Sequence, residues 1–472
     1  MAPYAAILSF VQHLTPTWRK PQQVGLARLI GALLERPTLC LSELARALPQ
    51  PTQPLHGRLK RLMRWLDNPR LDELALTARC LRLSYRLGDD PVDQPGGARG
   101  QAGGARPLLA ILLDTTSFEP FAALVAAVAC GGRALPLALA TYHRTSLQAA
   151  FPPPERWPVH GQPTAAGPAA ARATSFRSQN QIEERLIDLV GQLLCPGLRG
   201  VLVADRGFAR ASLFRGLQRQ GRDFVIRIDA ATHVALRPAG PSAPAAAALA
   251  LRPRERRWIV GGAYHKDARV PVNLLAVWEP QQEEPWYLAT SLERADWAEQ
   301  LYRWRMRIEC ANRDEKTGVL LRQGGDAHGL TSLLHLHRVR LALLVATWLC
   351  ALSGLQAHRD LAPAAPRPAD ALPHTPPNAQ AAAWLDAGPA PPPPPVPHRG
   401  PAPATPPGLR RFTARGSLSY VRLGLEVLRA PDLAWLLRRL VHWLGLYLWS
   451  WTPWYRPWQI RYRLAHWWLD ST

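Results

Sequence analysis

Cysteine is scarce and scattered in this sequence. Six cysteines occur among 472 residues, and no two of them are separated by only two residues. Structural zinc sites and the disulfide frameworks of small secreted domains need closely spaced cysteines, so the pattern argues against both. We expect reduced thiols, mostly in the core of a cytoplasmic protein, at positions 40, 80, 130, 195, 310 and 350.

Long hydrophobic runs are also missing. The longest, LALLVATWLCAL at 341–352, is shorter than the roughly 20 residues that a helix needs to cross a bilayer. The first residues, MAPYAAILSFVQHL, have neither a basic start nor a cleavage-like site, so we expect no signal peptide. Together these absences predict a cytoplasmic protein with no membrane partner.

Acidic residues are few relative to basic ones. The chain has 57 Lys and Arg against 35 Asp and Glu, a formal net charge of +22. GC-rich coding explains abundant Ala, Pro and Arg, but not an excess of cations over acids. Such an excess favours a polyanionic partner, because basic side chains release counterions when they bind phosphates.

One segment, 301–316, combines cations with an acid at helical spacing. It reads LYRWRMRIECANRDEK and contains neither Gly nor Pro, which predicts a helix. Tyr302, Arg305, Glu309 and Lys316 then form one stripe, because residues three and four apart share a helical face. The cations can bind phosphate oxygens while the carboxylate binds a metal ion. The alternative is a solvated helix held by salt bridges.

Two further acids follow apolar runs upstream. Asp114 ends LLAILLD and precedes two threonines, and Asp205 ends GVLVAD and precedes Arg206 and Gly207. With the 302–316 stripe, these motifs resemble the DDE transposases of bacterial insertion sequences, in the group with the signature Y-(2)-R-(3)-E-(6)-K. The resemblance spans about residues 20 to 355. It implies that Asp114, Asp205 and Glu309 are the catalytic, metal-binding acids.

The same resemblance implies a reaction and its partners. The substrates would be the terminal inverted repeats of a transposon and a target DNA, both double-stranded, and a homodimer would hold them in the synaptic complex. Two Mg²⁺ (or Mn²⁺) ions would serve DNA cleavage and then strand transfer. Arg305 and Lys316 would orient phosphates, and Tyr302 would bind a phosphate or pack. Trp297 has two interpretations: stacking on a displaced base, or core packing.

The order of the predicted helices and strands fits a mixed α/β fold, that of an RNase H-like domain. Three strands, a helix, a strand, a helix and a strand are predicted in turn, at 108–113, 121–130, 134–142, 180–194, 200–204, 209–220 and 223–228. A long apolar helix is predicted at 330–355. Asp205 and Glu309 are separated by 104 residues, since 309 − 205 = 104, and we expect a β-rich insertion at 230–292.

Composition divides the whole chain into five parts. We expect a helical DNA-binding domain, a Gly/Pro-rich linker, the catalytic domain, a Pro/Ala-rich disordered linker and a Trp/Arg-rich helical tail, at 1–90, 91–107, 108–355, 356–407 and 408–472. The tail is consistent with a dimer contact, a base-stacking surface or a helix docked on the catalytic domain.

A basic amphipathic helix is predicted at 55–71, after a shorter helix at 41–48. Leu59, Leu62, Met63 and Leu66 should point inward, while Arg58, Arg61 and Arg64 should lie largely on other faces and contact DNA. The arrangement resembles a helix-turn-helix unit. An ordinary helical bundle with a solvated basic face is an equal alternative.

Three functions therefore compete. The first is a transposase, the second an RNase H-like DNA nuclease without strand transfer, and the third an inactive DNA-binding relic of a mobile element. Helical register also separates Glu309 from Glu315: six residues turn a helix by about 600°, so the two acids project about 120° apart. Only Glu309 lies on the signature stripe, and we expect it, not Glu315, to face the two aspartates.

Overall fold

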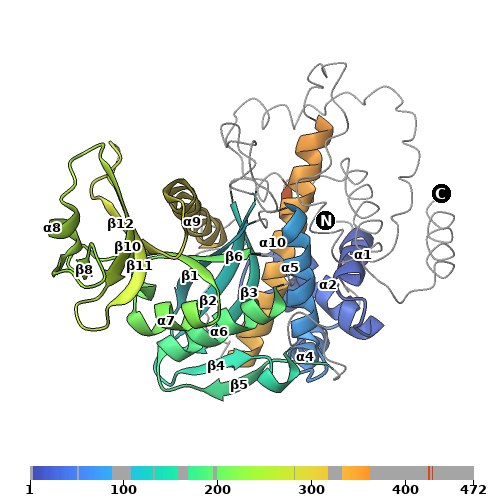
Figure 1. The fold of residues 1–472 in the computed structure, drawn as a ribbon. Coiled ribbons are helices and arrows are strands. Elements are labelled where there is room, and N and C mark those ends of the chain that lie inside the picture. Colours follow the sequence, from blue (N-terminus) through green and yellow to red (C-terminus); the bar gives the residue numbers. More distant parts are fainter. Residues whose placement is uncertain are drawn as a thin grey trace, which may run out of the picture.

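The strands in the described part of the chain form a single mixed sheet. The computed structural model describes residues 4–49, 53–87, 108–130, 133–157, 168–194, 199–280, 282–316 and 332–361, with residues 424, 425 and 428. Twelve strands follow the order β5-β4-β3-β2-β1-β6-β7-β12-β11-β10-β8-β9 (Figure 1). The two predicted linkers at 91–107 and 356–407 and nearly all of the predicted tail lie outside the described residues, save the first few residues of the second linker.

The middle of the sheet has the predicted element order. β1, β2 and β3 pair antiparallel in sequence order, β6 runs parallel to β1, and β7 runs parallel to β6. Two helices, α6 and α7, lie between these strands in the chain, so the succession of strands and helices expected from the sequence is confirmed. The bounds are β1 Leu108–Phe118, β2 Phe121–Cys130, β3 Arg133–His143, α6 Gln179–Leu193, β6 Arg199–Ala204, α7 Ala211–Arg219 and β7 Asp223–Ile228.

Two short strands extend the sheet beyond β3. β4 (Gln148–Phe151) pairs with β3, and β5 (Arg172–Ser175) pairs with β4. The sequence indicated neither of these strands, nor the 3₁₀ helix η2 (Pro154–Arg156). Strands of four residues are too short for a periodic pattern, so their pairing with a longer neighbour specifies them.

The segment between β7 and α9 continues the same sheet on its other side. β12 pairs antiparallel with β7, and β11, β10, β8 and β9 follow in order. A bulge interrupts β10 between Ile259 and Gly262, where Gly261 has a φ of +71°, a conformation that suits glycine. The bounds are β8 His233–Ala235, β9 Ser242–Pro244, α8 Ala245–Leu249, β10 Arg256–Tyr264, β11 Val270–Val277 and β12 Trp286–Thr290.

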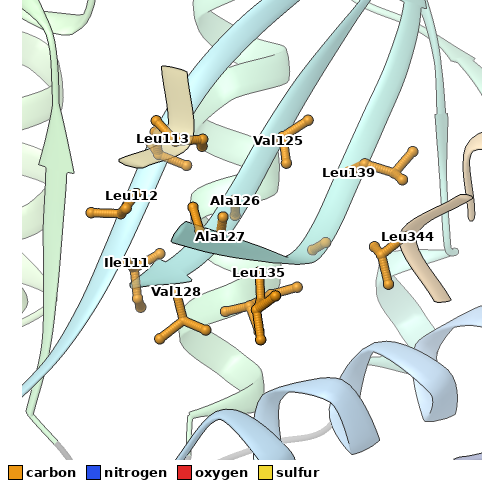
Figure 2. Packing of buried hydrophobic residues seen from close by; sticks show 14 of the residues in the cluster. Ile111, Leu112, Leu113, Val125, Ala126, Ala127, Val128, Leu135, Leu139 and Leu344 are labelled. Carbon is orange, nitrogen blue, oxygen red and sulfur yellow. The ribbon is translucent and has the colours of Figure 1, made fainter. Parts of the chain in front are cut away.

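Helices cover both faces of the central strands. On one face α6 and α7 pack against Ile111 and Leu113 of β1. On the other face lie α9 (Ala295–Lys316) and α10 (Leu333–Leu361), next to β2 and β3. Figure 2 shows this packing around Val125, Leu139 and Leu344. Because side chains alternate along a strand, the residues of β1 next to Ile111 and Leu113 point to the α9 face, and Asp114 is one of them.

α10 is the predicted long apolar helix. Its segment Leu333–Leu355 is long and apolar enough to cross a membrane, which the shorter run at 341–352 did not suggest. However, 94% of its most apolar window is buried within the protein. Contacts with β3 and with the N-terminal helices account for this burial, as in the core helix of a globular domain.

Among the described residues, five helices precede the sheet, and α2, α4 and α5 contact α10. α4 ends at Leu66, not at residue 71, because Pro69 follows closely. Met63 was predicted inward but is exposed, whereas Trp65 is buried and its indole N–H donates to the Gln22 carbonyl at 3.0 Å. The bounds are α1 Tyr4–Leu14, α2 Lys20–Glu35, α3 Leu41–Ala47, α4 Leu55–Leu66 and α5 Glu73–Leu87.

The described cysteines, at 40, 80, 130, 310 and 350, are all free thiols. Cys80, Cys130 and Cys350 are buried in the core. This agrees with the expectation from their wide spacing. Cys195 lies outside the described residues.

Candidate active site

The first two predicted acids stand side by side on neighbouring parallel strands. In the β1–β6 ladder Leu112 is opposite Val203, and two residues further along each chain come Asp114 and Asp205. Neighbouring strands lie about 4.8 Å apart, and side chains two residues apart share a face. Both carboxylates therefore project from adjacent positions on the face that α9 covers.

Asp114 lies within β1, and not at its end as the sequence suggested. The antiparallel pairing with β2 continues past Asp114, opposite Val125, as far as Phe118 opposite Phe121. The apolar run ends at residue 113 because the next side chains approach a polar site. The strand itself does not end there, since β2 continues beside it.

Asp205 begins a tightly held turn. It caps the 3₁₀ helix η3 (Arg206–Phe208), and its Oδ1 accepts a hydrogen bond from the Gly207 backbone N–H at 3.0 Å. From β10, the Tyr264 hydroxyl donates to the Ala209 carbonyl at 3.0 Å. Arg210 then binds the buried Glu183 of α6 with a 2.5 Å contact. These contacts fix the backbone on the downstream side of the second acid.

Tyr302 belongs to the core side of α9. Only 2% of it is exposed, and its ring packs edge-on against Trp286 with a centroid distance of 5.0 Å. Burial raises the pKa of its hydroxyl, which has no hydrogen-bond partner among the described residues. Of the two roles expected for Tyr302, packing is therefore the one seen in the structure. Trp297 is half-buried against the core, below the Arg294 guanidinium.

Arg305 interacts with all three predicted acids. It is 8% exposed, and its Nη1 is 2.6 Å from Oε1 of Glu309, one helical turn later. Burial lowers the pKa of this guanidinium, but Tyr302, Glu309 and Asp205 raise it more. The buried guanidinium of Arg305 therefore neutralises Glu309 and also interacts electrostatically with Asp205.

The negative charge of the Asp114 carboxylate is only partly balanced by the groups around it. Burial raises its pKa, and the charge of Asp205 raises it further, against hydrogen bonds from the Thr115 backbone and Asn312 and the charge of Arg305. Two carboxylates that repel each other in a half-buried site provide the hard oxygen ligands that Mg²⁺ and Mn²⁺ prefer. The residues present therefore fit a divalent cation at this position.

The third predicted acid is not gathered with the first two. Among the described residues, no three His, Cys, Asp or Glu side chains are close enough together to hold a metal ion. Glu309 lies on the expected stripe but binds Arg305. The side chains of residues 313–316 lie outside the described set, so Glu315 and Lys316 are placed only by their backbone on α9.

Asn312 is a site residue that the sequence reading missed. Its Nδ2 donates to Oδ2 of Asp114 at 2.5 Å, which joins α9 to β1. The signal was present in the sequence: Asn312 follows Arg305 by seven residues, two full helical turns, and so lies on the signature stripe.

A second feature that the sequence did not indicate is a large cavity beside the Asp205 turn. Its volume is about 470 Å³, and Arg206, Arg227, Trp278 and Tyr287 line it together with Glu284. Two cations and two aromatic rings face one space, but both cations are paired with acids of the same lining: Arg227 with Glu284, and Arg206 with Asp229 at 3.8 Å. The charge of Arg227 also opposes the rise in the pKa of Tyr302 that burial causes.

The predicted DNA-contacting arginines of α4 are not equivalent. Arg61 and Arg64 are exposed, as expected. Arg58 is half-buried, and its guanidinium donates to the Arg46 carbonyl near the end of α3 at 3.0 Å. Arg58 therefore links the two helices, whereas Arg61 and Arg64 face solvent together with Lys60.

Comparison with known proteins adds an independent finding. Residues 176–337 match the family model of the transposase DDE domain, which covers Asp205, Arg305 and Glu309 but begins after Asp114. No curated protein matches this chain. The match supports a DDE transposase, a family of nucleases that act on DNA and generally use divalent metal ions.

Proposed function

We propose that this protein is a transposase that cleaves DNA at the ends of an insertion sequence of the Y-R-E-K group and joins the freed ends to target DNA. The observation that carries the proposal is the β1–β6 register, which sets Asp114 beside Asp205 under the helix that bears Arg305 and Glu309. The match at residues 176–337 supports the same chemistry.

Asp114, Asp205 and Glu309 are the residues that would hold the metal, two Mg²⁺ or Mn²⁺ ions. When bound, the ions supply charge stabilisation and nucleophile activation for in-line displacement at phosphorus. The side chains have complementary roles. Asp114 and Asp205 present adjacent carboxylates from the sheet, and Glu309 would complete the set of three acids on giving up its contact with Arg305.

Arg305 and Lys316 orient the phosphates on either side of the cut. Arg305 suits this role because its guanidinium is buried and preorganised, and a phosphate oxygen replaces Glu309 as its partner. Tyr302 packs behind Arg305 and limits its movement. The 470 Å³ cavity next to Asp205 is of the size that accommodates small ligands. Its arginines would extend the phosphate-binding surface on exchanging their partners Asp229 and Glu284 for phosphate.

The N-terminal helices would recognise the terminal repeats. We assign residues 1–90 to DNA binding and 108–355 to catalysis, with 230–292 as an insertion between the second and third acids. Arg61 and Arg64 on α4 face outward and supply phosphate contacts, while Arg58 fixes α4 to α3. A homodimer would bring two ends together in the synaptic complex.

Two assays separate this proposal from its rivals. A double-stranded DNA that carries the inverted repeats flanking the gene is incubated with Mg²⁺ and a supercoiled target plasmid. A transposase nicks at the repeat boundary and yields joined products. A nuclease without strand transfer cuts but never joins, and an inactive relic binds the repeats without cutting; either result would refute the proposal.

A further inference from the structure

Asn312 is a half-buried amide beside a mostly apolar space. It borders a cavity of about 40 Å³ whose lining is mostly hydrophobic, including Ile308 and Ala311 of α9 and Leu343 of α10. A polar amide in such surroundings is costly unless its groups are hydrogen-bonded. The bond to Asp114 satisfies the donor side of this amide, so the contact is a specific reason for asparagine at this position.

The geometry of the contact leaves the acid available. Asn312 donates to Oδ2 of Asp114, so Oδ1 is free of this bond. An amide is neutral, so it neither competes with a cation for the carboxylate nor adds to the repulsion between Asp114 and Asp205. A lysine or arginine at the same place would neutralise Asp114 and weaken its attraction for a metal ion.

The contact also links two elements that must move together. Asp114 lies on β1 and Asn312 on α9, 198 residues later in the chain. The same helix carries Arg305 and Glu309, so the bond fixes the height of the signature helix above the first acid. Arg340 of α10 lies over the ring of Phe118, further along β1, at 4.3 Å, which supports the strand from the same side.

We infer that Asn312 is a positioning residue of the catalytic centre, which orients the Asp114 carboxylate for metal binding and holds the signature helix against β1. The inference rests on the proposed function for its chemistry. Partners of this kind, which orient a metal ligand, typically change metal affinity or activity by about 10- to 100-fold when removed.

The test uses the full chain and Mn²⁺ as the probe. Asn312→Ala and Asn312→Leu both remove the donor, and Leu keeps most of the volume, so packing and hydrogen bonding are separated. Mn²⁺ binding is measured without DNA by electron paramagnetic resonance, and kcat and KM are measured with repeat-end DNA. Gln300→Ala, which removes another half-buried amide on α9, is the matched control.

Both Asn312 variants should bind Mn²⁺ about 10- to 100-fold more weakly and lose kcat to a similar degree, with KM for DNA nearly unchanged. Gln300→Ala should resemble the wild type. If Asn312→Leu binds Mn²⁺ and cuts like the wild type, Asn312 only fills space and the inference is wrong. A wild-type protein that binds Mn²⁺ through Asp114 but never cuts repeat ends would instead refute the proposed function, while the Mn²⁺ affinities still decide the role of Asn312.

Discussion

Two groups of buried charge in this molecule differ in how their charges are balanced. One joins α5 to α10: His337 Nε2 and Arg338 Nε lie 2.9 and 3.2 Å from the two oxygens of Glu73, and all three side chains are 3% exposed. The other is the acid site, where Asp114 lies beside Asp205 and, among the described residues, is compensated by hydrogen bonds from Asn312 and the Thr115 backbone and by the charge of Arg305. In the first group the carboxylate is paired with cations of the fold, although the buried Nδ1 of His337 has no hydrogen-bond partner among the described residues. In the second group two carboxylates are adjacent and only partly balanced.

The pKa shifts of the two groups have opposite directions. Burial alone would raise the pKa of Glu73, but the hydrogen bond from His337 and the charges of His337 and Arg338 outweigh it and lower the pKa. Burial raises the pKa of Asp114, and Asp205 adds to the shift. The comparison teaches that a buried charge can stabilise the fold where the protein supplies an opposite charge. Where the protein supplies too little opposite charge, the buried group can instead bind a ligand.

The largest expected effect is on catalysis. Asp114→Asn, Asp205→Asn and Glu309→Gln should each lower the rate of end cleavage by at least about 1000-fold, a loss of about 4 kcal/mol of transition-state stabilisation. Binding of repeat-end DNA should be retained, as measured by gel shift. Glu315→Gln is the control on the same helix and should keep most of the activity. A Glu315 variant as inactive as the Glu309 variant would overturn the choice of the third acid.

The cluster of Glu73, His337 and Arg338 should instead affect the stability of the fold. Glu73→Gln leaves the Arg338 guanidinium buried without the negative charge that balances it, so the free energy of unfolding should fall by about 3 kcal/mol, measured by urea denaturation. The matched control is Glu43→Gln, which breaks an exposed pair with Arg36 and Arg46 in the same helical region. Its effect should be far smaller. Equal effects would show that α5 is not held to α10 by this cluster.

A smaller effect is expected on DNA binding by α4. Arg61→Ala and Arg64→Ala should each flatten the dependence of log affinity on log salt by about one unit, because each removes one phosphate contact. Arg58→Ala should leave that slope unchanged, since its guanidinium binds a backbone carbonyl. If all three variants behave alike, Arg58 exchanges its carbonyl contact for DNA.

The smallest effect concerns pH. Because the pKa of Glu73 is lowered by folding, its stabilisation is complete above the ordinary Glu range and is lost as pH falls below about 4. The pKa of Asp114 is raised, so the folded state binds more protons and stability falls as pH rises above about 4. Melting curves in EDTA should therefore show Asp114→Asn gaining stability over the wild type as pH rises, whereas Glu73→Gln loses it. Parallel curves for the two variants would contradict this difference in sign.

Several elements were predictable because local patterns encode them. The apolar runs before Asp114 and Asp205 identified β1 and β6, and helical spacing placed Tyr302, Arg305 and Glu309 on one face of α9. β4 and β5 were not predictable, because four residues carry no period and the neighbouring strand specifies them. The predicted end of β1, at residue 113, was wrong for the same reason: pairing with β2 extends the strand through Asp114 to Phe118.

By itself, the sequence determined which residues have the chemistry: two acids after apolar runs, and a helix whose stripe carries an arginine and a glutamate. Only the tertiary structure decided their relations. The β1–β6 register set Asp114 beside Asp205, a contact across 198 residues brought Asn312 to Asp114, and Arg305 took Glu309 as its partner. The reason is physical: spacing along a chain fixes the face of a helix or strand, whereas the distance between two elements depends on how they pack.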